Sequence, residues 1–291
     1  MEKPKVSIIG AGRVGTALAV LLSRRGYKIV GVSDESLEVA KSCADQASCS
    51  LGTTDSAEVC QGADIILITT PDSVLQGIAE GIAAKKGFKK GQFVIHTSGL
   101  LSSKVLSPAR FFGAYTLSMH PIQTFAKISG EIPSLAGTYF VLEGDSVAIE
   151  QGKQIVADLD GFAVTIPPEA KMLHHTACSL TSNYLVTLLF LAQTIYEKIG
   201  ISEDDSEKML LPLLKGTIKN IEELGVQNAL TGPIERGDLE TVKKHLEVLE
   251  TNLPELLKLY KELGRYTVEL MKRKQTIPEE KTNILKDLFR I

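Results

Sequence analysis

The stretch IIGAGRVG at positions 8–15 constrains the fold of this chain more than any other feature. It places Gly10, Gly12 and Gly15 in G-x-G-x-x-G spacing, after a short apolar run and before a segment with helical periodicity. In such a unit the first glycine permits a tight turn, the second lets a pyrophosphate approach the backbone, and the third allows close helix–sheet packing. The alternative, a glycine turn without a ligand, is disfavoured by this setting. The sequence therefore predicts a dinucleotide-binding loop.

Strand-like and helical segments alternate along the first half of the chain. The strand-like runs are short and apolar and end at glycine, proline or polar residues, whereas the segments between them have helical periodicity. This alternation predicts crossover units and a mainly parallel, doubly wound α/β sheet of the Rossmann type. The predicted strands are 5–9, 29–33, 63–70, 92–96, 114–119, 139–142 and 163–166, and the predicted helices are 14–25, 37–47, 73–85 and 147–159.

The pattern changes at Pro167 and Pro168, after which no segment resembles a strand. We therefore predict a dinucleotide-binding domain at 1–167 and an all-α domain for substrate and dimerisation at 168–291. The first helix of this second domain is apolar on nearly every face, which predicts burial on all sides. The predicted helices are 169–199, 206–224, 238–250, 254–272 and 278–289.

Composition narrows the class of protein. The formal net charge is −3 with mixed signs, which argues against a nucleic-acid partner. The first residues show no signal peptide, and the most apolar stretch, 184–192, is short for a membrane span. The four cysteines lack the pair spacing of a redox or zinc site, so we expect free thiols, no metal and a cytoplasmic location.

Asp34 follows the second predicted strand, nineteen residues after Gly15. An acidic residue at this place hydrogen-bonds the ribose 2′-hydroxyl of NAD and repels the 2′-phosphate of NADP. The alternatives are a solvated turn, or a carboxylate that points away while Arg13 meets a 2′-phosphate. The cofactor is therefore NAD or NADP, with a weak preference for NAD. We expect Arg13 and Val14, at the start of the first helix, to contact it as well.

Three strand ends carry residues suited to a ligand, because ligands of open α/β sheets bind beyond the carboxyl ends of the strands. Thr70 and Pro71 follow one strand, Ser98 and Gly99 follow the next, and His120 follows a third. Small and hydroxyl residues at these places let a nicotinamide ring approach the backbone. His120 fits a catalytic role and a structural role equally well, whereas His96 fits a structural role better.

A polar stripe opens the helical domain. Lys171, His175, Ser179 and Asn183 recur every four residues and so share one slowly drifting stripe on a helix that is otherwise rich in apolar residues. A lysine near a helix N-terminus is disfavoured by the helix dipole, which lowers its pKa toward the range useful for proton transfer. The stripe predicts Lys171, His175 and Asn183 as catalytic, against the alternative of a solvated lysine and a packed histidine. His174 lies about 100° around the helix from His175 and is expected to be structural.

Several motifs together resemble a bacterial family of oxidoreductases with a Rossmann-like N-terminal domain and a helical C-terminal domain of unassigned function. The architecture is similar to pyrroline-5-carboxylate reductase, ketopantoate reductase and 3-hydroxyisobutyrate dehydrogenase. In the last of these, a lysine and an asparagine one turn later serve the substrate; Lys171 matches the lysine, and His175 takes the asparagine position. The motifs are IIGAGRVGTALA (8–19), HTSGLLS (96–102), SMHPIQTFA (118–126), K-x-x-x-H with SNYL (171–185), LLPLLKGTIKNI (210–221) and ALTGPIERGD (229–238).

The resemblance also bears on the cofactor and on assembly. Many relatives carry Ser-Arg after the second strand, which suits NADP, whereas this chain carries Asp34 and Glu35 there. Related two-domain reductases pack their helical domains together around a two-fold axis, so we expect a homodimer. The loop 229–238 then approaches the partner's cleft and brings Arg236 to an anionic group of the substrate.

The leading functional interpretation is an NAD(P)-dependent oxidoreductase that moves hydride between the nicotinamide and a small carbonyl, hydroxy or imine compound. The alternative is a non-catalytic dinucleotide-binding or redox-sensing protein, in which the glycine loop would look the same. The polar stripe of Lys171, His175 and Asn183 discriminates between them, because a sensor needs no proton relay. A methyltransferase is disfavoured, because its fold does not normally carry such a helical second domain.

Overall fold

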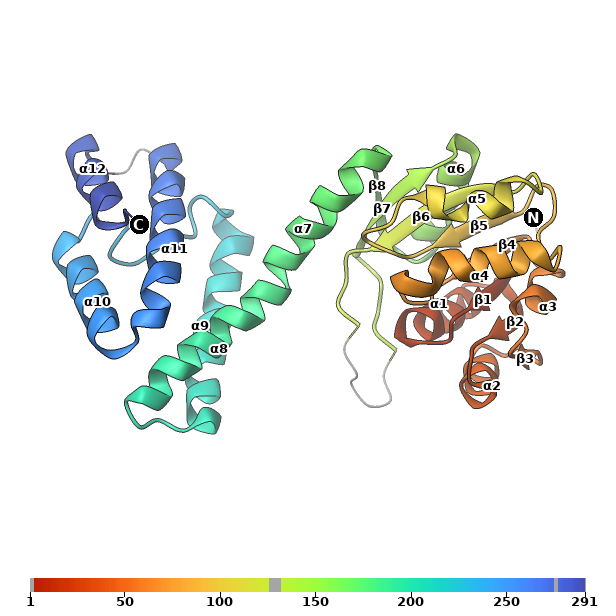
Figure 1. The fold of residues 1–291 in the computed structure, drawn as a ribbon, viewed down its shortest axis with the longest axis horizontal. Helices are drawn as coiled ribbons and strands as arrows, with labels where there is room; N and C mark the ends of the chain where they lie inside the picture. The colour runs from red at the N-terminus through yellow and green to blue at the C-terminus, as the bar shows by residue number, and fades with distance from the viewer. Residues whose placement is uncertain (1–2, 126–131, 275–276, 291) are drawn as a thin grey trace. The chain divides into compact units, whose positions relative to one another are not determined.

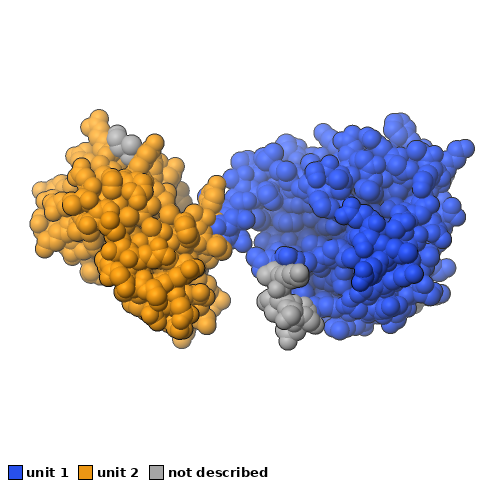
Figure 2. Space-filling model, turned by 60° about the horizontal axis from the view of Figure 1, so that its bottom comes forward, with its two compact units in different colours: residues 1–183 blue, residues 184–291 orange. Residues whose placement is uncertain are grey.

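A computed structural model describes residues 3–125, 132–274 and 277–290 of the chain. The chain forms two compact units, Met1–Asn183 and Tyr184–Ile291, coloured separately in Figure 2. The sheet ends at Thr165, close to the predicted boundary at 167/168. The helix that follows nevertheless belongs to the first unit, because its first residue is anchored in the sheet.

The first unit contains an eight-stranded sheet in the order β3-β2-β1-β4-β5-β6-β7-β8 (Figure 1). The strands from β3 to β6 are parallel, whereas β7 pairs antiparallel with β6 and parallel with β8. The prediction of a mainly parallel Rossmann sheet is confirmed. The strands are β1 Lys5–Ile9, β2 Lys28–Ser33, β3 Gly52–Thr53, β4 Ile65–Ile68, β5 Phe93–His96, β6 Tyr115–Pro121, β7 Tyr139–Gly144 and β8 Phe162–Thr165.

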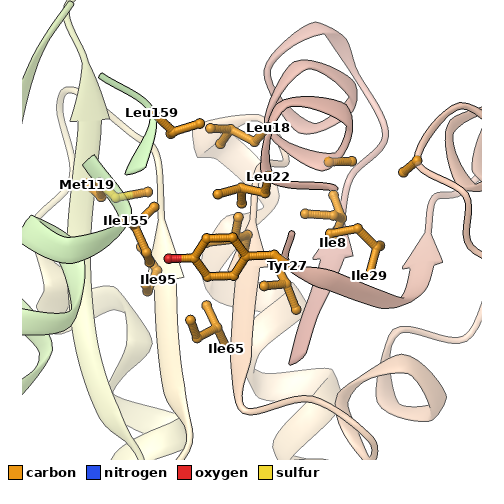
Figure 3. Packing of buried hydrophobic residues seen from close by; sticks show 14 of the residues in the cluster. Ile8, Leu18, Leu22, Tyr27, Ile29, Ile65, Ile95, Met119, Ile155 and Leu159 are labelled. Atoms are coloured by element: carbon orange, nitrogen blue, oxygen red, sulfur yellow. The ribbon is translucent and has the colours of Figure 1, made fainter. Parts of the chain in front are cut away.

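Helices cover both faces of this sheet. Successive strand residues point to opposite faces, so Ile8 joins one core and Ile9 the other. The first core lies under α1, α2 and α6, and Figure 3 shows its labelled side chains from β1, α1 and β4 turned toward one another. The second core lies under α3, α4, η1 and α5. These helices are α1 Arg13–Arg24, α2 Leu37–Gln46, α3 Ser56–Cys60, α4 Asp72–Ala84, η1 Ser103–Leu106, α5 Ser107–Arg110 and α6 Ser146–Asp158.

A long helical stretch follows the sheet. The short 3₁₀ turn η2 Pro168–Ala170 leads into α7 Lys171–Thr181, and α8 Asn183–Lys198 continues after a distortion at Ser182. We predicted a single helix, whereas the structure divides it at Ser182. Within one chain α8 contains no buried residue, so its burial on all sides stays a prediction that depends on the homodimer. By length and composition alone, the stretch Pro168–Lys198 could cross a membrane. One such helix is only weak evidence for a membrane span.

In the described part of the second unit, helices joined by loops are the regular elements. Its small core joins Val242, Val268, Leu285 and Phe289. Gly264 makes this packing possible, because a Cβ atom there would lie 2.4 Å from the ring of Phe289. The helices beyond α8 are α9 Glu203–Leu224, α10 Leu239–Asn252, α11 Pro254–Lys274 and α12 Glu279–Leu288.

Candidate active site and cofactor cleft

The glycine loop between β1 and α1 is packed tightly against the end of β4. Gly10 has φ +92°, and a Cβ atom there would lie 2.8 Å from the amide nitrogen of Thr70. A Cβ atom on Gly15 would lie 2.0 Å from the carbonyl oxygen of Gly10. The hydroxyl of Thr69 donates to that same oxygen at 2.6 Å. Gly10 and Gly15 are therefore required by the packing of loop, helix and sheet.

Gly12 has a different role. It is the N-cap of α1, and a Cβ atom there would meet nothing within 4 Å. The absent side chain leaves the first amide groups of α1 open, at the positive end of the helix dipole, where an anion binds favourably. The side chain of Arg13, one residue on, donates from Nη1 to the carbonyl oxygen of Phe125 at 2.9 Å.

A cleft of about 980 Å³ runs along the carboxyl ends of the parallel strands within the first unit. Sequence reasoning identified much of its lining. Gly15 lies outside the lining, because it packs behind the loop. The hydroxyl oxygen of Thr70 is buried without a hydrogen-bond partner among the described residues. The predicted cofactor residues that line the cleft are Gly10, Gly12, Arg13, Val14, Asp34, Thr70, Pro71, Ser98 and Gly99.

Asp34 is held in place by backbone donors. One carboxylate oxygen accepts from the amide of Ala11 at 2.8 Å, and the other accepts from the amide of Ser36 at 3.0 Å. These bonds tie the end of β2 to the glycine loop and fix the carboxylate at the wall of the cleft. Together with Glu35, it makes this part of the lining acidic.

Lys171 is buried beside the other end of the cleft, with 2% of its surface exposed, and does not line it. Its ammonium group donates to the carbonyl oxygen of Ser98 and to the hydroxyl of Ser118, both at 2.7 Å. Burial lowers the pKa of Lys171 to about 8, although the nearby carboxylates of Glu143 and Asp72 oppose this shift. Sequence reasoning predicted the lowered pKa but attributed it to the helix dipole.

His120 and His175 do line the cleft. Both rings lie over Gly99, because a Cβ atom there would lie 2.8 Å from Nε2 of His120 and 2.8 Å from Cδ2 of His175. Burial lowers the pKa of His120 to about 3, and the charge of Lys171 contributes to this shift. At neutral pH His120 is therefore a neutral imidazole at the wall of the cleft.

A row of buried polar side chains crosses three neighbouring strands behind this wall. His96 on β5 pairs in register with Ser118 on β6, which pairs in register with Glu143 on β7. Glu143 accepts from the amide and the hydroxyl of Ser103 at 2.7 and 2.8 Å. Sequence reasoning missed Ser118, Glu143 and Ser103; the signal available was an acidic residue inside the apolar run YFVLEG.

The remaining predicted residues lie elsewhere. Asn183 is exposed and does not line the cleft. The cause is helix geometry, because twelve residues separate it from Lys171, or about 18 Å at 1.5 Å per residue. Arg236 belongs to the second unit, so its predicted role stays a prediction. Among the described residues, no group of three His, Cys, Asp or Glu side chains is arranged to hold a metal ion.

The described residues fit a dinucleotide. The open helix N-terminus at Gly12 suits a pyrophosphate, the unpaired hydroxyl of Thr70 offers a hydrogen bond, and Asp34 stands where a ribose would lie. A nicotinamide ring at the far end of the cleft would face Gly99 and the two imidazoles of His120 and His175.

Comparison with known proteins agrees with this architecture. Residues 1–121 match the model of a Rossmann-like domain, and residues 138–267 match that of a domain of unknown function, DUF2520. The sequence matches none of the curated proteins with which it was compared.

Three solved structures show how widely the fold is shared. The protein TM1727 from Thermotoga maritima is 24% identical with a TM-score of 0.76, covering 93% of this chain and 99% of its own. BF3122 from Bacteroides fragilis, which carries the provisional name NADP oxidoreductase, is 27% identical with a TM-score of 0.70, covering 91% and 98%. Pyrroline carboxylate reductase from Plasmodium falciparum, with NADP bound, is 15% identical with a TM-score of 0.57, covering 100% of both chains.

Proposed function

We propose that this chain, a Rossmann-like domain joined to a DUF2520 domain, is an NAD(P)-dependent oxidoreductase acting on a small carbonyl, hydroxy or imine compound. One observation carries the proposal: a single cleft joins the glycine loop to a cluster of proton-bearing side chains at His120 and His175. The names of BF3122 and of the reductase from Plasmodium falciparum belong to the same class of reaction.

Within this function the cofactor, when bound, gives or takes the hydride, and the chain handles the proton. We assign the proton donor to Nε2 of His120, because this atom faces the cleft while Lys171 lies behind the wall. Nε2 has no hydrogen bond to any described residue, which leaves it free for a substrate oxygen or nitrogen. His175 lies beside it and orients the substrate. Lys171 acts through its positive charge and through its hydrogen bonds to the carbonyl oxygen of Ser98 and the hydroxyl of Ser118.

A screen for turnover tests the proposal. The protein is incubated with NADH or NADPH and a panel of small aldehydes, ketones and cyclic imines, and the loss of reduced cofactor is followed. His120→Phe should lower turnover by about 10²-fold or more and leave cofactor affinity unchanged. Lys171→Ala should also lower turnover by about 10²-fold. Full activity in both variants would remove these residues from the mechanism.

The cofactor preference follows from Asp34. The two backbone hydrogen bonds keep its carboxylate at the cleft, so it does not turn away from a 2′-phosphate. We therefore propose that NAD(H) binds at least as tightly as NADP(H). Titration of both cofactors by calorimetry measures this, and Asp34→Ser should shift the preference toward NADP(H). If NADP(H) binds the wild type more than about tenfold tighter, a gap of about 1.4 kcal/mol, the argument fails.

A redox sensor is the second candidate. It would bind the same cofactor, and the four free thiols suit the reducing cytoplasm in which either protein would work. The cluster around Lys171 favours the enzyme, because burying an ammonium beside three imidazoles is unfavourable without a chemical use. A protein that binds NADH tightly but turns over no member of the panel would favour the sensor.

We also propose a homodimer in which α8 packs against a second copy. This helix exposes Val186, Leu188, Phe190 and Ile195 at 66%, 41%, 62% and 40% of their surface. At 100° per residue, Val186 and Phe190 lie on one side of the helix and Leu188 and Ile195 on the opposite side, and exposed apolar surface of this extent marks an interaction site. A second copy is the partner implied by the resemblance to two-domain reductases, and a membrane is the competing one.

Light scattering separates these possibilities. Phe190→Glu should convert the dimer to a monomer, whereas Phe111→Glu, at a 90% exposed position in the first unit, should leave it dimeric. A wild-type monomer in solution refutes the dimer, and binding to lipid vesicles would favour the membrane. Mixing Lys171→Ala with Arg236→Ala chains then tests a shared site: heterodimers should regain activity if Arg236 serves the cleft of its partner.

A further inference from the structure

His174 contacts the proposed proton donor directly. It lies on α7 and is half-buried, and its Nε2 lies 2.9 Å from Nδ1 of His120. The two residues are 54 positions apart in the sequence, so only the packing of α7 against β6 brings them together. Sequence reasoning assigned His174 a structural role, because it does not share the helix face of His175.

The tautomers of the two rings are coupled. A hydrogen bond between two imidazole nitrogens needs one donor and one acceptor, and a neutral ring carries a single proton. If His174 donates from Nε2, Nδ1 of His120 is the acceptor and the proton of His120 is on Nε2, which faces the cleft. If His120 donates from Nδ1, its Nε2 is an acceptor. The pair therefore has two states, one that can give a proton to the cleft and one that can take it.

We infer that His174 relays protons between solvent and His120, so that Nδ1 of His120 gains a proton as Nε2 gives one to the substrate and the ring stays neutral. In the reducing direction the Nε2–H bond of His120 breaks as its proton passes to the substrate oxygen or nitrogen. The Nε2–H bond of His174 breaks and an Nδ1–H bond forms on His120. His174 then takes a proton from water at its own Nδ1, which leaves hydroxide, and both rings now carry their proton on Nδ1. The starting state returns when Nε2 of His120 takes a proton from water in the cleft, Nε2 of His174 takes the Nδ1 proton of His120, and Nδ1 of His174 releases its own proton to water. The oxidising direction reverses each step. This inference rests on the proposed function for the substrate at one end.

The groups around the pair favour a relay through neutral rings. Lys171 on α7 lies close to both rings, and His175 on the same helix and His96 on β5 add further cationic groups when protonated. A positive charge on His120 is therefore disfavoured, by burial first and by these neighbours second. The carboxylates of Glu143 and Asp72 act on Lys171, and the thiol of Cys178 lies 4.0 Å from Nδ1 and 3.9 Å from Nε2 of His174. A neutral imidazole as proton donor is a known solution in such a field.

The competing explanation is that His174 only holds the ring of His120 in place. His174→Gln separates the two, because the glutamine amide can donate a hydrogen bond to Nδ1 or accept one from it but cannot take up a proton at one atom and release it at another. His174→Phe removes both functions. His245→Gln is the matched control, since His245 lies on α10 in the second unit and bonds the hydroxyl of Tyr260.

Two measurements test the relay. The first uses the protein without substrate: imidazole nitrogen shifts are recorded by NMR, and the five histidines are assigned with single variants. We expect His120 and His174 to exchange between their tautomers together, at one common rate, in the wild type, because a proton on Nδ1 of one ring requires a bare Nε2 on the other. A single fixed tautomer of His120 in the wild type, or exchange of the two rings at different rates, would overturn the relay.

The second measurement uses a substrate found in the screen. We expect His174→Gln to lower turnover by about tenfold or more with unchanged KM and cofactor affinity, and free imidazole to restore turnover in His174→Ala. Turnover of His174→Gln equal to that of the wild type and of His245→Gln would mean that His174 only positions His120. If no compound is turned over, the proposed function fails, while the tautomer measurement still decides the relay.

Discussion

Gly15→Ala tests the tight packing on which the cofactor loop depends. The new Cβ atom would lie 2.0 Å from the carbonyl oxygen of Gly10 and 2.5 Å from the hydroxyl of Thr69. Both oxygens belong to the contact between the glycine loop and the end of β4. Because the nearer atom is backbone, no side-chain rotation relieves the clash, and α1 must move away from the loop.

The size of the effect follows from this movement. A tolerable contact requires a displacement of roughly 1 Å, and overpacking of this kind costs about 1–3 kcal/mol of stability. The same displacement moves the first amide groups of α1 away from a bound pyrophosphate. A hydrogen bond to a charged group contributes about 1.5–3 kcal/mol, so losing one weakens cofactor binding by about 10- to 150-fold.

Calorimetry measures both effects, by titration with NADH and by thermal unfolding. Gly77→Ala is the matched control: Gly77 lies within α4, and a Cβ atom there would meet nothing within 4 Å. This control should bind NADH like the wild type and gain about 0.5–1 kcal/mol of stability. If Gly15→Ala binds NADH as tightly as Gly77→Ala and unfolds at the same temperature, the packing argument is wrong.

Three further variants test other parts of the molecule. Gly99→Ala should push His120 off its position over the cleft and lower turnover by about 10²-fold, which steady-state kinetics measures; unchanged turnover would show that the ring has room to move. Lys171→Met tests the buried ammonium: since the pKa of Lys171 is lowered from 10.5 to about 8, the unfolded chain binds more protons than the folded chain between these values. The free energy of unfolding of the wild type relative to the variant should therefore rise by up to about 3 kcal/mol across this window, and a constant difference in urea unfolding would contradict the burial. Gly264→Ala should destabilise the second unit by about 1–3 kcal/mol through its clash with Phe289; loss of NADH affinity in this variant would show that the two units are coupled.

The sequence predicted the fold well because its long elements are locally marked. The run ADIILITT is apolar throughout, as a strand covered on both faces must be, and the structure buries all of Ile65–Ile68. The missed elements are short: β3 has two residues and α3 has five. Elements of this size have no periodicity to detect, because they are fixed by their neighbours in the sheet and by the Asp55 cap of α3.

The candidate site was predicted in part, for a related reason. The strand ends at Thr70, Ser98 and His120 were found because parallel strands in an open sheet present their carboxyl ends at one edge. The polar stripe on α7 was recognised from the sequence, but the burial of its individual residues was not. Helical spacing puts Lys171 and Asn183 on one slowly drifting stripe, and it does not show which of them meets the sheet.

Local sequence patterns do not predict the row of buried polar side chains behind the cleft. His96, Ser118 and Glu143 are more than twenty residues apart in the sequence, and their alignment is set by the register between β5, β6 and β7. Such a row costs stability unless each group is hydrogen-bonded. Lys171 bonds Ser118 and Ser103 bonds Glu143, whereas Nε2 of His96 is buried without a hydrogen-bond partner among the described residues. A shift of β6 by one residue would turn Ser118 to the other face and leave Lys171 without this acceptor. The register that positions Ser118 for Lys171 therefore also places His120, two residues along the same strand, at the wall of the cleft.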